Sequence, residues 1–179
     1  MNRIVKKMLL ATAGVWDPIW VQWYRLQSGE KGPIPPFKNR DRVGARDISW
    51  FLHSGSTDCQ TFSDAIGRWE ARELEELAIL DFGAGCGRIL RHFIPEVSTL
   101  AASDVDPTAV DYLRKAFPTV QSAVNDSRPP LPFVGEQFDC IYAFSVWTHL
   151  PIDLQDEWLA EACRILKPGG LLLISTMGY

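Results

Sequence analysis

The chain has 179 residues, of which 46% are hydrophobic and 22% are charged, and its formal net charge is −4. This length and composition predict a globular protein with one domain-sized core. Basic and acidic residues are mixed along the sequence, whereas nucleic-acid-binding proteins usually concentrate basic residues on one face, so no nucleic-acid partner is expected. A local basic patch and a solvated loop are equal alternatives for the stretch with Arg40, Arg42 and Arg46.

The cysteines and the N-terminal residues bear on location. Cys59, Cys86, Cys140 and Cys163 lie far apart, with no CxxC pair and no histidine cluster beside them. We therefore expect no disulfide framework, no metal site and a reducing, cytoplasmic location. The basic start and the apolar run after it imitate a signal peptide, but this run is short and leads straight into WDPIWVQWYRL. No run is long enough for a transmembrane helix, and no membrane partner is expected.

Residues 1–77 are predicted to form an N-terminal helical extension and linker that acts as a lid. One or two helices are expected over residues 3–26, where three tryptophans recur at helical spacing and form a stripe that packs on the domain body or on a partner. Residues 28–44 are rich in glycine and proline and are predicted to be a loop. A short helix stopped by Gly55 follows, and then a helical segment over residues 57–77 with a break near Gly67.

From residue 78 to residue 179, predicted strands alternate with predicted helices. This alternation indicates a parallel sheet covered by helices on both faces, with ligands bound at the carboxyl ends of the strands. The strands are expected at residues 78–82, 98–105, 119–124, 138–146 and 171–177, and the helices at residues 87–95, 107–117 and 152–167.

The first strand leads into a glycine turn in ILDFGAGCGRIL, residues 79–90. Gly83, Gly85 and Gly87 allow the backbone to turn sharply and to approach a ligand. Dinucleotide sites use G-x-G-x-x-G, but here the third glycine of that pattern is replaced by Arg88. Asp81, just before the turn, would repel a pyrophosphate and suits a ligand with an ammonium group, such as S-adenosylmethionine.

The second predicted strand ends in Asp104, 21 residues after Gly83. An acid at this position can accept hydrogen bonds from both ribose hydroxyls, so it favours a ribose-containing ligand over a bare phosphate. A solvated acid at a strand end is the alternative. Asp106, which precedes Pro107, is predicted to cap the next helix.

Four motifs, in the order and spacing of one family, span residues 79 to 176: LDFGAGCG, ASDVDPTAV, NDSRPPLPFVGEQFDCIYAFSVWTHL and LAEACRILKPGGLLLIS. With them the chain resembles the class I S-adenosylmethionine-dependent methyltransferases. IPPFKNRDRVGARDISWFLHSG and SVWTHL are similar to a bacterial subgroup of uncertain substrate. The resemblance implies a Rossmann-like, doubly wound, mainly parallel α/β sheet with strand order 3-2-1-4-5 and S-adenosylmethionine as the cofactor.

The resemblance also implies roles for single residues. The glycine turn would frame the methionine and adenosine portions of the cofactor, Asp81 would serve its ammonium group, and Asp104 the ribose hydroxyls. Asn125 or Asp126, with Asp126 favoured, would bind the adenine amino group. For Arg42 and Arg88, contact with the cofactor carboxylate competes with a surface salt bridge, which is favoured. The predicted cofactor-binding residues are Asp81, Gly83, Ala84, Gly85, Gly87, Asp104, Val105, Asn125, Asp126, Ser145 and Arg42.

The predicted reaction is the in-line transfer of a methyl group to an oxygen or nitrogen of a small molecule. A general base is needed only if the acceptor is an alcohol or a protonated amine. His149, just past the fourth predicted strand, is the candidate catalytic base, and a histidine that hydrogen-bonds loop backbone is the alternative.

The family sheet usually ends in an antiparallel hairpin that gives it seven strands, whereas the pattern here provides five. The last strand would then be an apolar edge, which natural proteins avoid. Three interpretations compete: a fragment, which is favoured, a homodimer that covers this edge, and N-terminal helices that fold over it. Two other functions also compete, a non-catalytic S-adenosylmethionine-binding or interaction domain and an NAD(P)-dependent oxidoreductase, the second disfavoured by Arg88 and Asp81.

Overall fold

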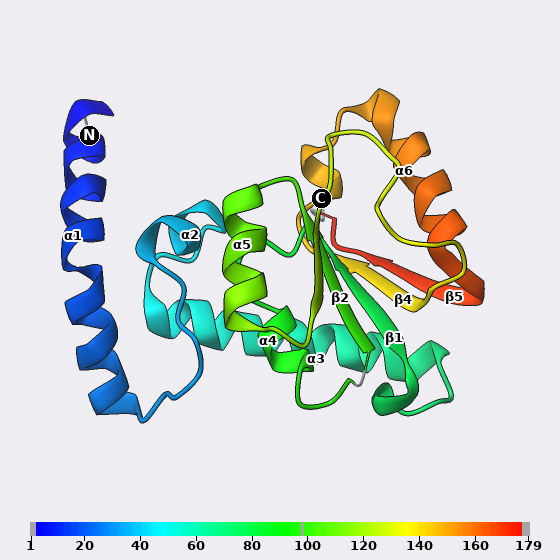
Figure 1. The fold of residues 1–179 in the computed structure, drawn as a ribbon, viewed down its shortest axis with the longest axis horizontal. Coiled ribbons are helices and arrows are strands. Elements are labelled where there is room, and N and C mark those ends of the chain that lie inside the picture. Colours follow the sequence, from blue (N-terminus) through cyan, green and yellow to red (C-terminus); the bar gives the residue numbers. More distant parts are fainter. Residues whose placement is uncertain (1–2, 98, 177–179) are drawn as a thin grey trace. The chain divides into compact units, whose positions relative to one another are not determined.

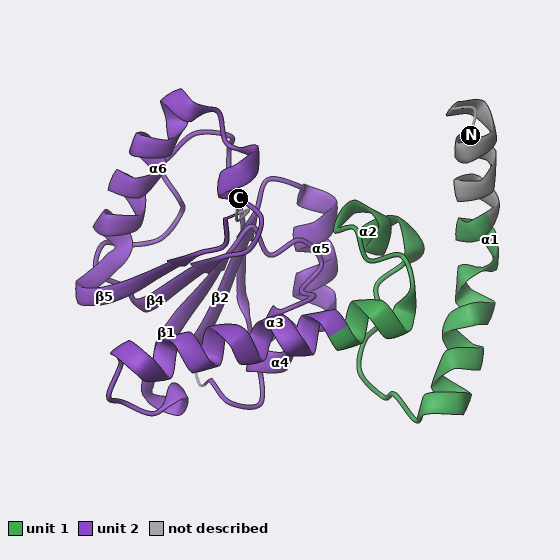
Figure 2. Ribbon diagram, turned by 180° about the vertical axis from the view of Figure 1, so that it is seen from behind, with its two compact units in different colours: residues 1–53 green, residues 54–179 purple. Residues whose placement is uncertain are grey.

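The structure is a computed structural model that describes residues 3–97 and 99–176, with side chains from Ala13 onward. The chain divides into two compact units, residues 1–53 and 54–179 (Figure 2). The second unit therefore includes residues 54–77, which the sequence pattern assigned to the extension. Within the described ranges, no helix is both long enough and apolar enough to cross a bilayer.

In the first unit, α1 (Arg3–Ser28) is one continuous helix that passes through Pro18. The prediction of a loop over residues 28–44 is wrong in part, because α2 (Phe37–Arg42) lies inside this stretch. The prolines precede α2 and so remove no hydrogen bond from it. The carboxylate of Asp17 accepts a hydrogen bond from the backbone N–H of Phe37 at 2.7 Å, which satisfies a donor in the first turn of α2.

The helix α3 (Ile48–Trp69) runs without interruption through Gly55 and Gly67. The predicted stop at Gly55 and break near Gly67 are therefore wrong. At Gly55 a Cβ would lie 2.1 Å from the carbonyl oxygen of Arg88, so this glycine serves close packing and not helix termination. The predicted helical segment to residue 77 is also too long, since only a short 3₁₀ turn, η1 (Leu74–Glu76), follows α3.

The second unit contains a five-stranded parallel sheet in the order β3-β2-β1-β4-β5 (Figure 1). Both the predicted sheet and the predicted strand order are confirmed. Two predicted strand residues, Ser98 and Met177, lie outside the described residues. The strands are β1 (Ala78–Phe82), β2 (Thr99–Asp104), β3 (Gln121–Val124), β4 (Phe138–Ala143) and β5 (Leu166–Ile174).

Helices cover both faces of this sheet, because β1 and β4 are apolar on both sides and would otherwise expose their side chains to water. Ile79 joins a core cluster that includes side chains from α3, α4 (Leu90–Phe93) and α5 (Pro107–Ala116). Leu80, the next residue, points to the opposite face and joins a cluster with α6 (Ile152–Ile165). The alternation along the strand thus divides the core into two layers.

Three predicted boundaries are wrong for local reasons. The helix expected over residues 87–95 is only α4, because residues 83–89 form turns and Gly87 has a φ of 77°. The strand expected to reach residue 146 ends at Ala143, and Ser145 lies in the left-handed region with a φ of 57°. The chain passes from α6 directly into β5, whose register against β4 shifts between Leu166 and Leu171, so the PGG segment forms an irregularity inside the strand.

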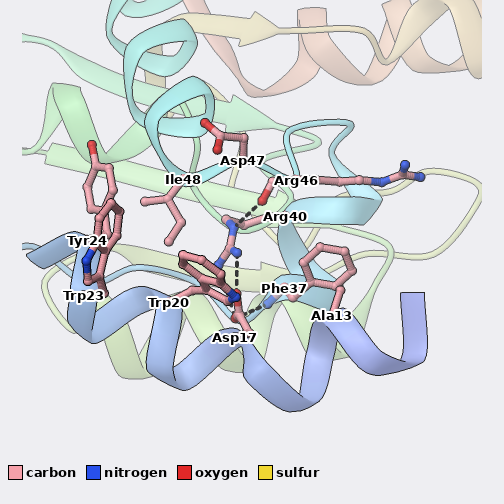
Figure 3. A pocket seen from close by; sticks show the side chains of 10 residues that line it. All are labelled: Ala13, Asp17, Trp20, Trp23, Tyr24, Phe37, Arg40, Arg46, Asp47 and Ile48. Atoms are coloured by element: carbon pink, nitrogen blue, oxygen red, sulfur yellow. Dashed lines mark hydrogen bonds and ion pairs between the residues drawn. The ribbon is translucent and has the colours of Figure 1, made fainter. Parts of the chain in front are cut away.

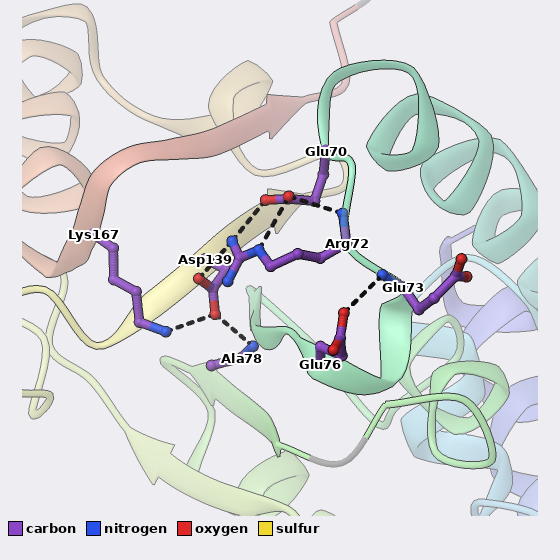
Figure 4. A network of polar contacts seen from close by, with 7 residues as sticks. All are labelled: Glu70, Arg72, Glu73, Glu76, Ala78, Asp139 and Lys167. Atoms are coloured by element: carbon purple, nitrogen blue, oxygen red, sulfur yellow. Dashed lines mark hydrogen bonds and ion pairs between the residues drawn. The ribbon is translucent and has the colours of Figure 1, made fainter.

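A network of polar contacts fastens the amino ends of three strands around Asp139 (Figure 4). Its buried carboxylate accepts hydrogen bonds from the backbone N–H of Ala78 at 2.8 Å and from Nζ of Lys167 at 2.7 Å. Arg72 completes the network with an ion pair at 2.9 Å. Burial acts to raise the pKa of Asp139, but these three partners outweigh it and hold the pKa below its ordinary value. This edge of the sheet is opposite to the one that carries the candidate site.

Candidate functional site

The candidate site lies at the carboxyl ends of β1, β2, β3 and β4. Because all four strands are parallel, the loops that follow them meet at one edge of the sheet. The predicted cofactor-binding residues at positions 81–126 and Ser145 all come from these strand ends or from the loops behind them. Arg42 does not, since it belongs to α2 in the first unit.

The glycine turn after β1 is fixed by backbone hydrogen bonds to the end of β2. The N–H groups of Gly83 and Ala84 donate to the carbonyl oxygen of Ser103 at 2.8 and 3.0 Å. Gly83 has a φ of 80°, and a Cβ on it would lie 2.3 Å from Cγ2 of Val146. Only glycine therefore allows the loops after β1 and β4 to approach this closely.

Gly85 and Gly87 give the turn its remaining shape. Both have positive φ, 54° for Gly85 and 77° for Gly87. A Cβ on Gly87 would lie 2.9 Å from Cδ2 of Leu113 and 3.0 Å from Cε2 of Phe117, so this glycine allows close packing against α5 and the residue that follows it. Gly87 thus allows the close helix packing that the third glycine of G-x-G-x-x-G allows in dinucleotide sites. It does so from one sequence position earlier than in that pattern.

Asp104 is buried, and its carboxylate holds two backbone N–H groups. Oδ2 accepts a hydrogen bond from Gly85 at 2.7 Å, and Oδ1 accepts one from Asp106 at 2.8 Å. Its carbonyl oxygen accepts the N–H of Asn125 at 3.1 Å. Asp104 therefore connects the loops after β1, β2 and β3.

Asp81 is only 3% exposed and lies at the end of β1, directly below the glycine turn. Burial raises the pKa of its carboxyl group to about 7, and the nearby charge of Asp104 adds to this rise. The Tyr142 hydroxyl and the Arg88 guanidinium act in the opposite direction. Tyr142 is paired with Asp81 in the register of β4 and β1, and this pairing brings its hydroxyl near the carboxyl group. A cationic group near this carboxyl would stabilise its charged form.

At the end of β3, Asn125 is buried and Asp126 is exposed. Nδ2 of Asn125 donates to the carbonyl oxygen of Asp126 at 2.8 Å, whereas its Oδ1 is buried with no hydrogen-bond partner. A buried, unpaired acceptor is unfavourable unless a ligand supplies the donor. The exocyclic amino group of adenine is such a donor, so this position fits the adenosine part of the predicted cofactor.

The end of β4 carries Ser145 and, further on, His149. The strained backbone of Ser145 is fixed by its N–H, which donates to Oγ of Ser175 just after β5, at 2.6 Å. His149 is the last residue of a short 3₁₀ turn, η2 (Trp147–His149), and its imidazole is exposed. Its N–H donates to the carbonyl oxygen of Val146 at 2.9 Å. The exposed ring is accessible to a substrate, and its catalytic role stays a prediction.

Arg88 is buried and already paired. Its Nη1 lies 2.6 Å from Oδ2 of Asp58 and donates to Oγ of Ser54 at 3.1 Å, and its guanidinium lies 4.8 Å from the ring centroid of Phe144. The favoured prediction for Arg88 was an ion pair on the surface. The ion pair is present, but its Arg88 partner is buried because α3 packs closely over this turn at Gly55.

Two contributors were missed by sequence reasoning. Tyr142 acts on the charge of Asp81 because the parallel register places them side by side, and the sequence signal was available only by aligning β1 with β4. Ser175 holds the backbone of Ser145 from a position 30 residues away. A contact of that kind has no local pattern in the sequence.

The fold and these loops define a Rossmann-like α/β domain of the class that binds nucleoside cofactors at the carboxyl ends of its strands. The chain belongs to the family described as "Methyltransferase domain", which matches residues 79–170. The methyltransferase family predicted from the four motifs is thereby confirmed.

Known proteins with similar sequences or structures fit this assignment. The chain is 33% identical over 104 residues to the malonyl-[acyl-carrier protein] O-methyltransferase of Hahella chejuensis, a match that covers 55% of this chain and 36% of that protein. It is 34% identical over 115 residues to the biotin biosynthesis bifunctional protein BioHC of Teredinibacter turnerae, covering 56% of this chain and 19% of that protein. The match thus spans well under half the length of these relatives.

Among solved structures, the S-adenosylmethionine-bound amino pentose methyltransferase CalS10 of Micromonospora echinaspora superimposes with a TM-score of 0.62 at 18% identity. The superposition covers 84% of this chain and 60% of that one. At this identity the likeness establishes the fold.

Proposed function

We propose that the chain binds S-adenosylmethionine at the carboxyl edge of its sheet and acts in the transfer of a methyl group to a small-molecule oxygen or nitrogen. One observation carries the proposal: two buried carboxyl groups, Asp81 and Asp104, lie against the glycine turn, near enough that the charge of one raises the pKa of the other. A pyrophosphate would add further negative charge there, whereas a sulfonium and an ammonium group would offset the charge already present.

In this proposal, different residues of the site contact different parts of the cofactor. The carboxylate of Asp104 accepts the ribose hydroxyls, and the glycine turn lets the backbone lie against the adenosine and methionine portions. Asn125 or Asp126 accepts the adenine amino group, and the unpaired Oδ1 of Asn125 supports a direct contact from that residue. Asp81 serves the ammonium group. Val105, Ser145 and Arg42 are also included in this proposed set of cofactor-binding residues.

S-adenosylmethionine, when bound, supplies a methyl group on a positively charged sulfur that is a good leaving group. The protein then has to hold the acceptor atom in line with this methyl group and to exclude water. His149 is exposed at the end of η2, where its imidazole can take a proton from an alcohol or an ammonium acceptor. The lid role of the N-terminal unit and the cytoplasmic location belong to the same proposal.

A homodimer that covers the edge of the sheet is part of the proposal for partners. β5 forms one edge, and residues 170–174 along it are only partly buried. Sedimentation velocity of the purified chain tests this point. A dimer that dissociates when Leu172 is replaced by lysine supports pairing at β5, whereas a monomer at micromolar concentration contradicts it.

Calorimetric titration distinguishes the proposed cofactor from its competitor. We expect S-adenosylmethionine and S-adenosylhomocysteine to bind and NAD to release no heat. Binding of NAD alone would refute the proposal. A methyl-transfer screen over phenols, amines, sugars and carboxylates then tests activity, and tight cofactor binding without any turnover would favour a non-catalytic domain.

A further inference from the structure

The helix α1 presents an apolar face to solvent. Six of its large apolar side chains from residue 15 onward are between 53% and 83% exposed. At the helical rotation per residue they lie within an arc of about 140° on one side of the helix. Large exposed apolar patches on a folded unit mark interaction sites. This apolar face of α1 consists of Val15, Trp16, Ile19, Trp20, Trp23 and Leu26.

A different side of α1 is already anchored within its own unit. Asp17 is buried, and its Oδ1 lies 2.5 Å from Nη2 of Arg40, while its Oδ2 accepts the N–H of Phe37 (Figure 3). Trp20 and Trp23 also line the pocket drawn in Figure 3, and their rings meet edge to face at a centroid distance of 5.8 Å. The helix is thus held by its Asp17 side, and of the residues on the apolar face only Trp20 and Trp23 also line this pocket.

The charged residues are distributed unevenly between the two units. Residues 1–53 contain nine basic and four acidic residues, whereas residues 54–179 contain nine basic and eighteen acidic residues. In α1 itself there are four basic residues, and the single acid is Asp17, whose charge is compensated by Arg40. The mixture of charges seen along the sequence becomes a separation of charges once the boundary between residues 53 and 54 is known.

We infer that α1 lies along an anionic lipid surface as an interfacial helix. Tryptophan rings prefer the boundary between lipid head groups and acyl chains, and an apolar face with basic residues beside it is the pattern of helices that lie in the plane of a membrane. The basic unit is attracted by anionic lipids, and the acidic unit is repelled from them. A second copy of the chain fits the same face less well, since two basic helices would then meet.

This inference revises the expectation of no membrane partner and does not depend on the proposed methyl transfer. It requires no transmembrane helix, because the helix stays at the surface of the bilayer. The predicted stripe of tryptophans is present, and each of these side chains is more than half exposed, although Trp20 and Trp23 also line the pocket of their own unit.

Vesicle co-sedimentation of the full chain tests the inference. We expect binding to vesicles of phosphatidylcholine and phosphatidylglycerol in equal parts, weak binding to pure phosphatidylcholine, and a decrease in affinity as salt rises. The double substitution W16S/I19S, which leaves the pocket-lining residues and the Asp17 attachment intact, is expected to lower the affinity about tenfold or more. L26S provides a second, milder variant at the far end of the same face.

The matched control is W69S, which removes a tryptophan that is 79% exposed at the end of α3, outside α1. It is expected to bind vesicles like the wild type, and circular dichroism checks that every variant keeps its helical content. No binding to the anionic vesicles, equal binding to both vesicle types, or an equal loss in W69S would overturn the inference. A wild-type dimer that W16S/I19S dissociates, with no vesicle binding, would assign the face to a second copy instead.

Discussion

The carboxylate of Asp104 accepts the backbone N–H of Gly85 at 2.7 Å, and this one contact joins the glycine turn after β1 to the end of β2. The acid predicted to hold the ribose is therefore also the residue that shapes the loop against which the adenosine would lie. The second oxygen of the same carboxylate holds the N–H of Asp106, so both oxygens are oriented before any ligand binds. Such preorganisation reduces the entropy that cofactor binding has to overcome.

Replacing Asp104 with asparagine is expected to weaken both the loop and the cofactor site. The amide retains only one acceptor oxygen, so one of the two backbone N–H groups loses its partner, at a cost of about 1–3 kcal/mol in the free energy of unfolding. We expect the affinity for S-adenosylmethionine to fall at least about tenfold. D111N is the control, because Asp111 makes only an exposed ion pair with Arg114. Equal effects of the two substitutions on cofactor affinity would contradict the role of Asp104.

Two glycines of α3 are expected to respond in opposite directions to alanine. G55A places a Cβ 2.1 Å from the carbonyl oxygen of Arg88 and should destabilise the protein by about 1–3 kcal/mol or more. G67A meets nothing within 4 Å and should stabilise it by about 0.5–1 kcal/mol, because alanine has the higher helix propensity. Urea unfolding measures both values. Destabilisation by G67A of the same size as by G55A would contradict the close approach of α3 to the turn.

The titration of Asp81 is expected to make stability fall as pH rises. Burial raises the pKa of this carboxyl group from 3.8 to about 7 in the folded state, so the folded protein holds the proton more tightly than the unfolded chain. The resulting stabilisation is complete below about pH 4 and is lost as the pH rises to 7. D81N removes the titration, so it should exceed the wild type in stability by about 2–4 kcal/mol at pH 8 and converge with it near pH 4.

The same group predicts a pH dependence of cofactor binding. A cationic ligand favours the charged carboxylate, so the affinity of the wild type for S-adenosylmethionine should increase between pH 5 and pH 7. D81N carries no charge there and should show a flatter profile, which also corrects for titration of the ligand itself. Parallel profiles for the two proteins would show that Asp81 does not serve the ammonium group.

The alternation of strands and helices was enough to predict a parallel sheet covered by helices on both faces, because strands of this spacing have few alternative connections. The strand order was predicted from the resemblance to the methyltransferase family. The roles of single glycines could not be predicted in this way. Gly55 and Gly67 look alike in the sequence, yet one is required by a backbone contact with Arg88 and the other lies in open space. The difference depends on a tertiary contact between residues 33 positions apart in the chain.

In the candidate site, too, some residues were predicted from local sequence patterns and others depend on tertiary contacts. Asp81, Asp104 and the glycine turn carry local patterns and were found directly, and their burial follows from their place at strand ends. The pairing of Tyr142 with Asp81 depends on strand register, which hydrophobic patterning does not specify when both faces of a strand are buried.

Asp139 is expected to contribute stability at neutral pH and to lose it in acid. Its pKa is held below the ordinary value, so its contribution is complete above the unfolded pKa and decreases as the pH falls through that range. D139N leaves Lys167 and Arg72 without their shared carboxylate and should cost about 2–3 kcal/mol at pH 7, measured by urea unfolding. E157Q, which breaks the exposed pair of Glu157 with Arg128, should change stability by less than about 1 kcal/mol. If E157Q lowered the free energy of unfolding as much as D139N, the prediction that the network around Asp139 stabilises the fold would be contradicted.

Substitution of His149 by alanine distinguishes a catalytic base from a residue that only shapes its loop. The imidazole is exposed, and the loop contact of this residue uses its backbone N–H, which H149A retains. We therefore expect the affinity for S-adenosylmethionine and the stability to stay unchanged while kcat falls about 10²-fold with an alcohol acceptor. H92Q is the control, since it removes a histidine of α4, which packs on one face of the sheet, and it should retain full kcat. A fall in cofactor affinity that matches the fall in kcat would assign His149 to binding, and an unchanged kcat would leave the acceptor to react without a base.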